Sequence, residues 1–217
     1  MNNLFDREFF GIVITTLTVT ISSTVISAIL GIPLGLWLQN MQFRGKALVV
    51  TFNRTMMAMP PVVAGLVVFL ILMRNGPLGF LGLLFSTPAM IIAQVVLITP
   101  IICGIVYNAA ERNAGDIRKF AHTMGASKSQ TLTLLVKELS GAMYFAIIAG
   151  FGRATSEVGA IMIVGGNIRH HTRTMTTSIV MLRNQGQIGQ AIAFGVFLMA
   201  IAFALQILAN FVYKKGE

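Results

Sequence analysis

The chain has 217 residues, of which 55% are hydrophobic and 11% are charged, whereas charged residues make up about 25% of a typical soluble domain. Its formal net charge of +9 comes with only 3 tyrosines, 1 tryptophan and no basic run in a polar module, which argues against nucleic-acid binding. A single cysteine, Cys103, excludes an intramolecular disulfide and a cysteine metal cluster. This composition predicts an integral membrane protein whose basic residues flank its membrane spans.

Several apolar segments are long enough to cross a bilayer, which requires about 20 residues per helix. They cover residues 9–38, 47–73, 88–108, 139–164 and 188–213. We therefore expect an all-α protein with five transmembrane helices in a single domain, residues 1–217. One set of connections carries nine Lys and Arg residues and the other carries five. Because the richer set belongs in the cytoplasm, the sequence predicts an external N-terminus, a cytoplasmic C-terminus and a cytoplasmic loop at 111–138.

The second apolar segment contains two adjacent prolines, Pro60 and Pro61, near its middle. Proline has no backbone N–H and bends a helix, and bent backbone exposed to lipid would leave polar groups without partners. We therefore expect a bend that faces protein or a water-filled path, with both prolines beside that path. In the third segment Gln94 is a lone polar side chain, and we expect it to pack between helices.

Residues 111–138 form the only long hydrophilic stretch away from the two ends of the sequence. Apolar residues recur there at helical spacing on each side of Gly125. They are Ile117, Phe120, Ala121 and Met124 on one side and Leu132, Leu135, Val136 and Leu139 on the other. Glycine adopts backbone angles that let a chain turn sharply. The pattern predicts two short amphipathic helices joined at Gly125, which favours a docking surface for a partner over a reaction centre.

The fourth apolar segment carries two opposite charges, Arg153 and Glu157, near its centre. Side chains four residues apart share one face of a helix, and ionisable groups at that depth are costly unless they pair or meet water. A structural ion pair is one interpretation. The other, favoured by the small residues around the pair, is the polar lining or gate of a path, formed by Arg153, Thr155, Ser156 and Glu157. Both roles can hold if the pair breaks as the path opens.

The segment after it is external by the charge count, yet it carries three arginines and two adjacent histidines. Arg169, His170 and Arg173 are candidates for docking a partner or attracting an oxyanion, and a solvated loop is the alternative. The nearby hydroxyl groups that could assist are those of Thr172, Thr174, Thr176 and Thr177. Adjacent histidines rarely chelate one ion and no third ligand is evident, so we expect no metal site.

The sequence lacks the motifs of several enzyme and carrier classes. It contains no Walker glycine loop, no G-x-S-x-G, no H-E-x-x-H and no paired carboxylates within a span. An intramembrane enzyme would need a catalytic partner for His170, His171 or a span serine, and a secondary carrier would need carboxylates beyond Glu157. Both alternatives are therefore disfavoured. We expect a protein that is not an enzyme by itself and whose transport energy comes from another polypeptide.

Three stretches of the sequence match a known pattern. Residues 119–127, KFAHTMGAS, resemble the EAA loop of ATP-binding-cassette (ABC) importer permeases, whose consensus opens E-A-A-x-x-x-G. Ala121 and Gly125 match this consensus, whereas Lys119 and Phe120 depart from it. Residues 57–65 and 150–168 are similar to the molybdate/tungstate branch of type I permeases. The resemblance covers nearly the whole chain and implies the type I ABC importer permease fold with a cytoplasmic coupling helix.

This resemblance implies the membrane subunit of an ATP-driven oxyanion importer, with tungstate as the first candidate and molybdate or sulfate as alternatives. It implies a homodimer embedded in the lipid of the cell membrane, two ABC ATPase subunits that carry ATP and Mg²⁺, and an extracytoplasmic oxyanion-binding protein. No cofactor is expected on this chain and no nucleic acid among its partners. The residues implied to couple to the ATPase are Ala121, His122, Thr123, Met124, Gly125, Ala126 and Ser127.

Overall fold

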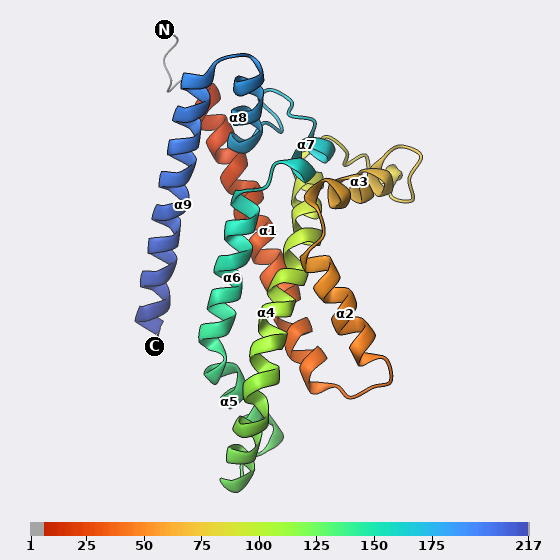
Figure 1. The fold of residues 1–217 in the computed structure, drawn as a ribbon, viewed down its shortest axis with the longest axis vertical. Coiled ribbons are helices and arrows are strands. Elements are labelled where there is room, and N and C mark those ends of the chain that lie inside the picture. The colour runs from red at the N-terminus through yellow and green to blue at the C-terminus, as the bar shows by residue number, and fades with distance from the viewer. Residues whose placement is uncertain (1–6, 217) are drawn as a thin grey trace.

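The computed structural model describes residues 7–216, and within that range it consists of helices and connecting loops without a β-strand (Figure 1). The predicted all-α fold class is confirmed. The helices are α1 (Arg7–Asn40), α2 (Lys46–Met57), α3 (Pro61–Leu72), the 3-10 helix η1 (Gly79–Leu81), α4 (Thr87–Thr123), α5 (Lys128–Glu138), α6 (Ser140–Thr155), α7 (Gly159–Gly165), α8 (Met175–Asn184) and α9 (Ile188–Gly216).

Within the described residues, three helices are long and apolar enough to cross a membrane by themselves: α1, α4 and α9. They contain the predicted spans 9–38, 88–108 and 188–213. Two more spans are formed if α2 joins α3 and α5 joins α6, but these pairs are bent by 104° and 53°. By length and composition, the described chain therefore has three crossings, or up to five.

The predicted second span, 47–73, is not one helix. α2 ends at Met57, and α3 begins at Pro61 after Pro60, whose ψ of 132° is extended. Pro60 cannot donate a helical hydrogen bond, and a residue that precedes a proline is driven away from helical angles. The two prolines together make the break, and the expected bend is confirmed as a turn of 104°.

The predicted fourth span, 139–164, is wrong as a single helix. α6 ends at Thr155, residues 156–158 are not helical, and the short α7 starts at Gly159. Neither flank of this break contains a proline. The cause lies in the neighbouring helices, because side chains of α4 and α8 bond the backbone groups that the break frees.

The long contact between α1 and α4 holds the centre of the molecule together (Figure 1). Gly35 of α1 faces α4 so closely that a Cβ there would lie 2.7 Å from the carbonyl oxygen of Cys103. Gly31, one turn earlier, also faces α4: a Cβ there would lie 3.0 Å from the Ile102 side chain and 3.1 Å from the carbonyl oxygen of Thr99. Small residues at this spacing let membrane helices approach closely. α9 in contrast runs along one edge of the molecule, and 6% of its apolar window is buried.

Residues 111–138 also differ from the expectation of two short helices. The first of them is the end of α4, which continues to Thr123, well past the predicted end of the span at residue 108. Ala109, Ala110 and Glu111 are strong helix formers, so the apolar run ends there but the helix does not. The second short helix is α5. Between the two, Gly125 has a φ of 70°, and the predicted glycine turn is confirmed.

Candidate functional site

The two helix breaks are neighbours, because α3 packs along α7 (Figure 1). Gly65 of α3 rests against Ala160 of α7, where a Cβ on Gly65 would lie 2.7 Å from the Cα of Ala160. Gly159 of α7 lies against the Val62 side chain of α3, and a Cβ at position 159 would lie 2.9 Å from a Val62 methyl group. A side chain at either glycine would push the helices apart. Glycines on both helices therefore fix the contact between the two breaks.

Gly65→Ala is expected to separate α3 from α7, because the added methyl group meets backbone atoms of Ala160, which cannot rotate away. We expect the free energy of unfolding to fall by roughly 1–3 kcal/mol, the usual cost of overpacking, with a lower melting temperature of the purified protein in detergent. Gly11→Ala is the matched control, since a Cβ there meets nothing within 4 Å. Equal melting temperatures of the two variants would contradict this packing.

Side chains from two other helices bond the backbone groups that the α6–α7 break frees. Gln94 of α4 is fully buried; its Nε2 donates to the carbonyl oxygen of Ala154 at 3.0 Å, and its Oε1 accepts from the Ser23 hydroxyl at 2.5 Å. The Thr176 hydroxyl of α8 donates to the carbonyl oxygen of Glu157 at 3.0 Å. Non-helical backbone within a membrane protein requires such partners. The expected helix-packing role of Gln94 is confirmed.

Glu157 has one backbone partner and one ionic partner. Its Oε1 accepts from the N–H of Ala160, in the first turn of α7, at 2.9 Å. Its Oε2 lies 3.7 Å from a guanidinium nitrogen of Arg153, and the two side chains are 2% and 34% exposed, respectively. The predicted pair forms, but not on one helix, because Glu157 lies beyond the end of α6. The carboxylate thus links the last turn of α6 to the start of α7.

The remaining predicted gate residues flank the two breaks. Pro60 and Ser156 are exposed and Pro61 is half-buried. The Thr155 hydroxyl donates to a backbone carbonyl one turn earlier, and its side chain lines a narrow cavity between α1, α6, α8 and α9. The structure therefore brings Arg153 and Glu157 together at the break, while Thr155 lines a cavity that α1 also lines. A role for these residues in a transport path stays a prediction.

The turn between α4 and α5 is defined by local hydrogen bonds. Ser127 is the N-cap of α5: its hydroxyl accepts from the N–H of Gln130 at 3.3 Å, and Gln130 Oε1 accepts from the N–H of Ser127 at 2.8 Å. This reciprocal arrangement is a capping box, which fixes where a helix starts. Together with the left-handed Gly125 it sets the angle between the two helices.

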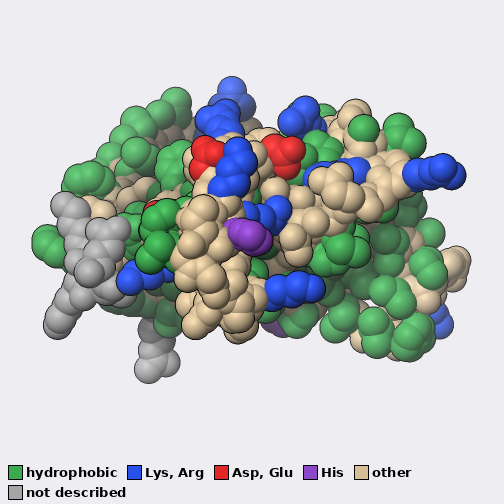
Figure 2. All heavy atoms as spheres, turned by 90° about the horizontal axis from the view of Figure 1, so that it is seen from below, with side chains coloured by type: hydrophobic (Ala, Val, Ile, Leu, Met, Phe, Trp, Pro, Cys, Tyr) green, Lys and Arg blue, Asp and Glu red, His purple; other side chains and the backbone are tan. Residues whose placement is uncertain are grey.

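Of the predicted coupling residues, Ala121 is buried and Ala126 is half-buried. The exposed ones are His122, Thr123, Met124, Gly125 and Ser127. Large apolar side chains are exposed on the same part of the chain, and we call them the α4–α5 surface: Phe120 (58% exposed), Met124 (71%), Leu132 (55%) and Val136 (40%). Exposed apolar side chains in so polar a segment are typical of a docking surface. Figure 2 looks onto this end of the molecule, where acidic and basic side chains lie near the middle and hydrophobic ones on both flanks.

The loop before α8 is tied to the start of α1 by ion pairs. Arg169 and Arg173, predicted as docking residues, both bind Glu8, with N–O distances of 2.6 and 3.0 Å. His170, the third predicted docking residue, has a left-handed φ of 61° and lines a cavity of about 240 Å³ beside Glu8. Glu8 neutralises part of the charge expected to attract an anion. Docking at this loop stays a prediction.

The expectation that threonine hydroxyls of this segment attract an oxyanion is wrong, because these side chains are buried and bonded inside the protein. Thr172 donates to the carbonyl oxygen of Gly165 at 2.5 Å. Thr174 and Thr177 form the capping box of α8. Among the described residues, no group of three His, Cys, Asp or Glu side chains is placed to hold a metal ion.

A family model described as "Binding-protein-dependent transport system inner membrane component" matches residues 31–215. The match includes both helix breaks and the α4–α5 surface. The chain belongs to this family. As an inner membrane component of a transport system, it is a membrane subunit and not an enzyme by itself.

Relatives of this inner membrane component cover nearly its whole length. The tungstate uptake system permease protein TupB of Peptoclostridium acidaminophilum is 41% identical over 201 residues, which cover 93% of this chain and 88% of that protein. A probable anion ABC transporter permease protein of Haloferax volcanii is 37% identical over 203 residues, covering 91% and 88% of the two chains. The predicted membership of the ABC importer permeases is confirmed.

A solved structure supports the fold independently. The crystal structure of a bacterial ABC transporter involved in the import of the acidic polysaccharide alginate matches with a TM-score of 0.76 at 19% identity, covering 97% of this chain and 80% of that one. The predicted ABC importer permease fold is confirmed.

Sequence reasoning missed part of the framework of this inner membrane component. The hydrogen bond from Thr176 to the break and the contact of Ser23 with Gln94 join segments far apart in the sequence. A lone glutamine in an apolar helix and a run of threonines at 172–177 were the available signals. Each indicates that a partner exists, but neither indicates which backbone group is bonded.

Proposed function

We propose that this inner membrane component is the permease subunit of an ATP-driven oxyanion importer whose first substrate is tungstate. The observation that carries the substrate is the 41% identity, over 93% of the chain, to a tungstate uptake permease. Molybdate is the closest alternative, since it is an oxyanion of the same charge and shape, and sulfate is the next.

The complex that we propose contains two copies of this chain, two ATPase subunits and an extracytoplasmic binding protein. ATP and Mg²⁺ bind to the ATPase subunits, and this chain carries no cofactor. The exposed side chains of Phe120 and Met124, 58% and 71% accessible, support a protein partner at the α4–α5 surface. A helix end that presents apolar anchors in this way suits a groove on a partner.

The membrane orientation that we propose places the α4–α5 surface in the cytoplasm and the N-terminus outside. The uneven distribution of Lys and Arg over the loops supports it. The end of the molecule that holds α5 also carries Arg112, Arg118, Lys119 and Lys128, all on α4 or α5. The loop with Arg169 and Arg173 then faces the binding protein.

In this proposal α4 transmits movement from the α4–α5 surface to the α6–α7 break. It runs as one helix from Thr87 to Thr123, and Gln94 near its start bonds Ala154 at the α6–α7 break. At 1.5 Å per residue, Gln94 lies roughly 45 Å from Met124 at the other end. When the ATPase subunits close on ATP, movement of the α4–α5 surface would displace Gln94 and the α6 end together. The break, whose ends are linked by Glu157, is where the path opens and closes.

Only weak and transient sites are needed along such a path, because tight binding would slow release. Arg153 suits this role, because its side chain is 34% exposed and Glu157 partly compensates its charge. An oxyanion that passes the break would meet one cation, Arg153, that is partly exposed and whose charge Glu157 only partly compensates. Selection between oxyanions then belongs mainly to the binding protein.

Uptake into proteoliposomes tests the proposal. The permease is reconstituted with its ATPase subunits, the binding protein and internal ATP, and tungstate, molybdate and sulfate are supplied separately outside. We expect ATP-dependent accumulation with tungstate first. Accumulation without the ATPase subunits would contradict an ATP-driven importer, and preference for sulfate over tungstate would contradict the proposed substrate.

A further inference from the structure

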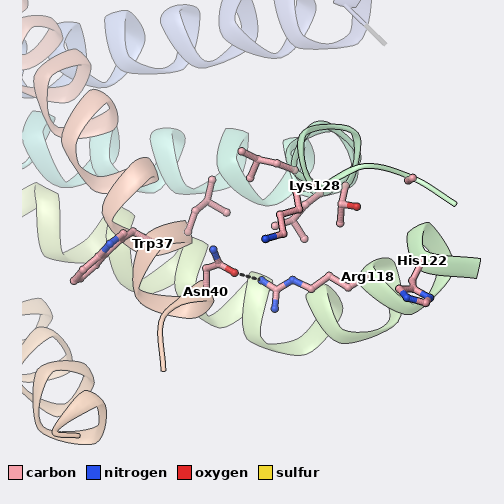
Figure 3. Close-up of a pocket in the computed structure, with 10 residues that line it drawn as sticks. Trp37, Asn40, Arg118, His122 and Lys128 are labelled. Carbon is pink, nitrogen blue, oxygen red and sulfur yellow. Dashed lines mark hydrogen bonds between the residues drawn. The ribbon is translucent and has the colours of Figure 1, made fainter. Parts of the chain in front are cut away.

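A cavity of about 700 Å³ opens between the end of α1, the end of α4 and α5. Figure 3 shows Arg118 extending along α4 toward Asn40, while Lys128 reaches into the same space from α5. The residues around the cavity are Leu36, Trp37, Asn40, Arg118, His122, Ala126, Lys128, Thr131, Leu132 and Leu135. They include two permanent cations and a histidine but no carboxylate. The cavity therefore has a surplus of positive charge.

The charge on Arg118 is not neutralised by its own hydrogen bonds. Its guanidinium donates to the side-chain oxygens of Gln39 at 2.7 Å and Asn40 at 3.0 Å, and both are neutral amides. These bonds hold the group in place beside the cavity. Lys128 forms no ion pair with another described residue. A cavity that is lined by two cations and no carboxylate is a favourable site for an anion.

The other half of the cavity is apolar and lies at the membrane boundary. Leu36, Leu132 and Leu135 contribute aliphatic side chains to its wall. Trp37 packs near Phe43, with ring centroids 6.2 Å apart, and both rings are exposed. No charged residue occurs from Phe9 to Phe43, and Arg44 is the first. Exposed aromatic rings at the end of an uncharged run mark the interface between lipid tails and headgroups.

We propose that this cavity binds the headgroup of an anionic phospholipid from the adjacent leaflet. The phosphate lies between Arg118 and Lys128, and the part of the acyl chains nearest the headgroup lies against Trp37. An amphiphile with an anionic head matches a cavity that is cationic on one side and apolar on the other. Basic pockets between membrane helices on the cytoplasmic side bind anionic headgroups in this way. The assignment to the cytoplasmic leaflet and the effect on coupling rest on the proposed function; lipid binding itself does not.

The site couples the bilayer to the transport machinery by position. Arg118 lies on α4 less than two turns from Met124, and Leu132 belongs to both the cavity wall and the α4–α5 surface. A bound headgroup would brace the end of α1 against α4 and α5. The lipid would thereby limit the movement of the end of α4 relative to α1, next to the surface on which the ATPase subunit acts.

Native mass spectrometry of the purified full chain tests this site by titration with phosphatidylglycerol or, separately, phosphatidylcholine. We expect phosphatidylglycerol to bind preferentially. Each cation near a lipid surface contributes about 1 kcal/mol, so Lys128→Gln should weaken binding about fivefold and the double variant Arg118→Gln/Lys128→Gln about thirtyfold. The matched control, Arg112→Gln/Lys119→Gln, removes the same charge from exposed positions on α4 and should bind as the unmodified protein does.

Three results would overturn the proposal. Equal weakening in the control would show that binding depends on overall charge and not on the cavity. Equal binding of the two lipids would remove the anionic requirement. Displacement of phosphatidylglycerol by millimolar tungstate or inorganic phosphate would assign the cavity to free oxyanions. Lys128→Gln alone decides if the double variant does not fold, because Lys128 makes no ion pair within the described chain. Failure of uptake in proteoliposomes would leave this measurement unaffected.

Discussion

Replacement of Glu157 by Ala is expected to abolish ATP-dependent uptake and to lower the melting temperature of the purified protein. The carboxylate is 2% exposed and holds both Arg153, at 3.7 Å, and the N–H of Ala160, at 2.9 Å. Its removal leaves a cation and a buried backbone donor without their partners. Loss of one member of a buried pair costs about 3–5 kcal/mol, and the lower end applies here because the Arg153 side chain is only partly buried. Thermal unfolding in detergent and uptake into proteoliposomes measure the two effects.

Glu157→Gln separates the two roles of this side chain. The amide oxygen can still accept from the Ala160 N–H, but the negative charge opposite Arg153 is lost. We expect the Gln variant to recover most of the melting temperature and little of the uptake. Full recovery of uptake would restrict Glu157 to a helix cap, and normal uptake by Glu157→Ala would remove any role for the pair.

Gly125→Val is expected to uncouple ATP hydrolysis from uptake while leaving membrane insertion intact. Gly125 has a φ of 70°, and a Cβ there meets nothing within 4 Å, so the effect is confined to the backbone. The left-handed conformation costs a residue with a Cβ about 1–2 kcal/mol, and a β-branched residue is a stronger outlier. The turn would relax and reorient Phe120 and Met124 relative to α5. ATPase activity and uptake, measured on the same proteoliposomes, give the coupling ratio.

Gly125→Asn is the control for that experiment. Asparagine tolerates the left-handed region better than other residues with a side chain, and the open space around position 125 accepts it. Its coupling ratio should stay near that of the unmodified protein. If Val and Asn variants couple equally well, the backbone turn at Gly125 does not set the geometry of the α4–α5 surface.

Features with a local cause were predictable from the sequence. Pro60 and Pro61 create the α2–α3 break through their own chemistry, and Gly125 creates the α4–α5 turn through its freedom at positive φ. The uncharged runs likewise predicted α1 and α9. In each case the residues that cause the feature are those that form it.

The α6–α7 break could not be predicted in the same way. Arg153 and Glu157 are four residues apart, a spacing that equally suits an unbroken helix. What decides against that helix is the pair of bonds from Gln94 and Thr176, which lie 60 and 19 residues away from their partners. Tertiary bonds of this kind leave no periodic signal in the sequence.

The extension of α4 was missed for a different reason. A change from apolar to polar residues after Asn108 marks the end of a membrane span, but the helix continues past it to Thr123. Helix formation outside lipid depends on propensity and packing, and Ala110, Ala114 and Ala121 pack inward on that extension. The consequence is functional, because a continuous α4 connects the α4–α5 surface with the break.

The most direct test of the account is cross-linking at Met124. In a Cys103→Ser background, Met124→Cys should cross-link to the ATPase subunit in membrane vesicles, with a yield that changes when ATP is added. Phe80→Cys is the control, because Phe80 is 80% exposed in the loop at η1, beyond the far end of α3. We expect an ATP-dependent cross-link at position 124 and none at position 80. A cross-link at 80 but not at 124 would contradict it.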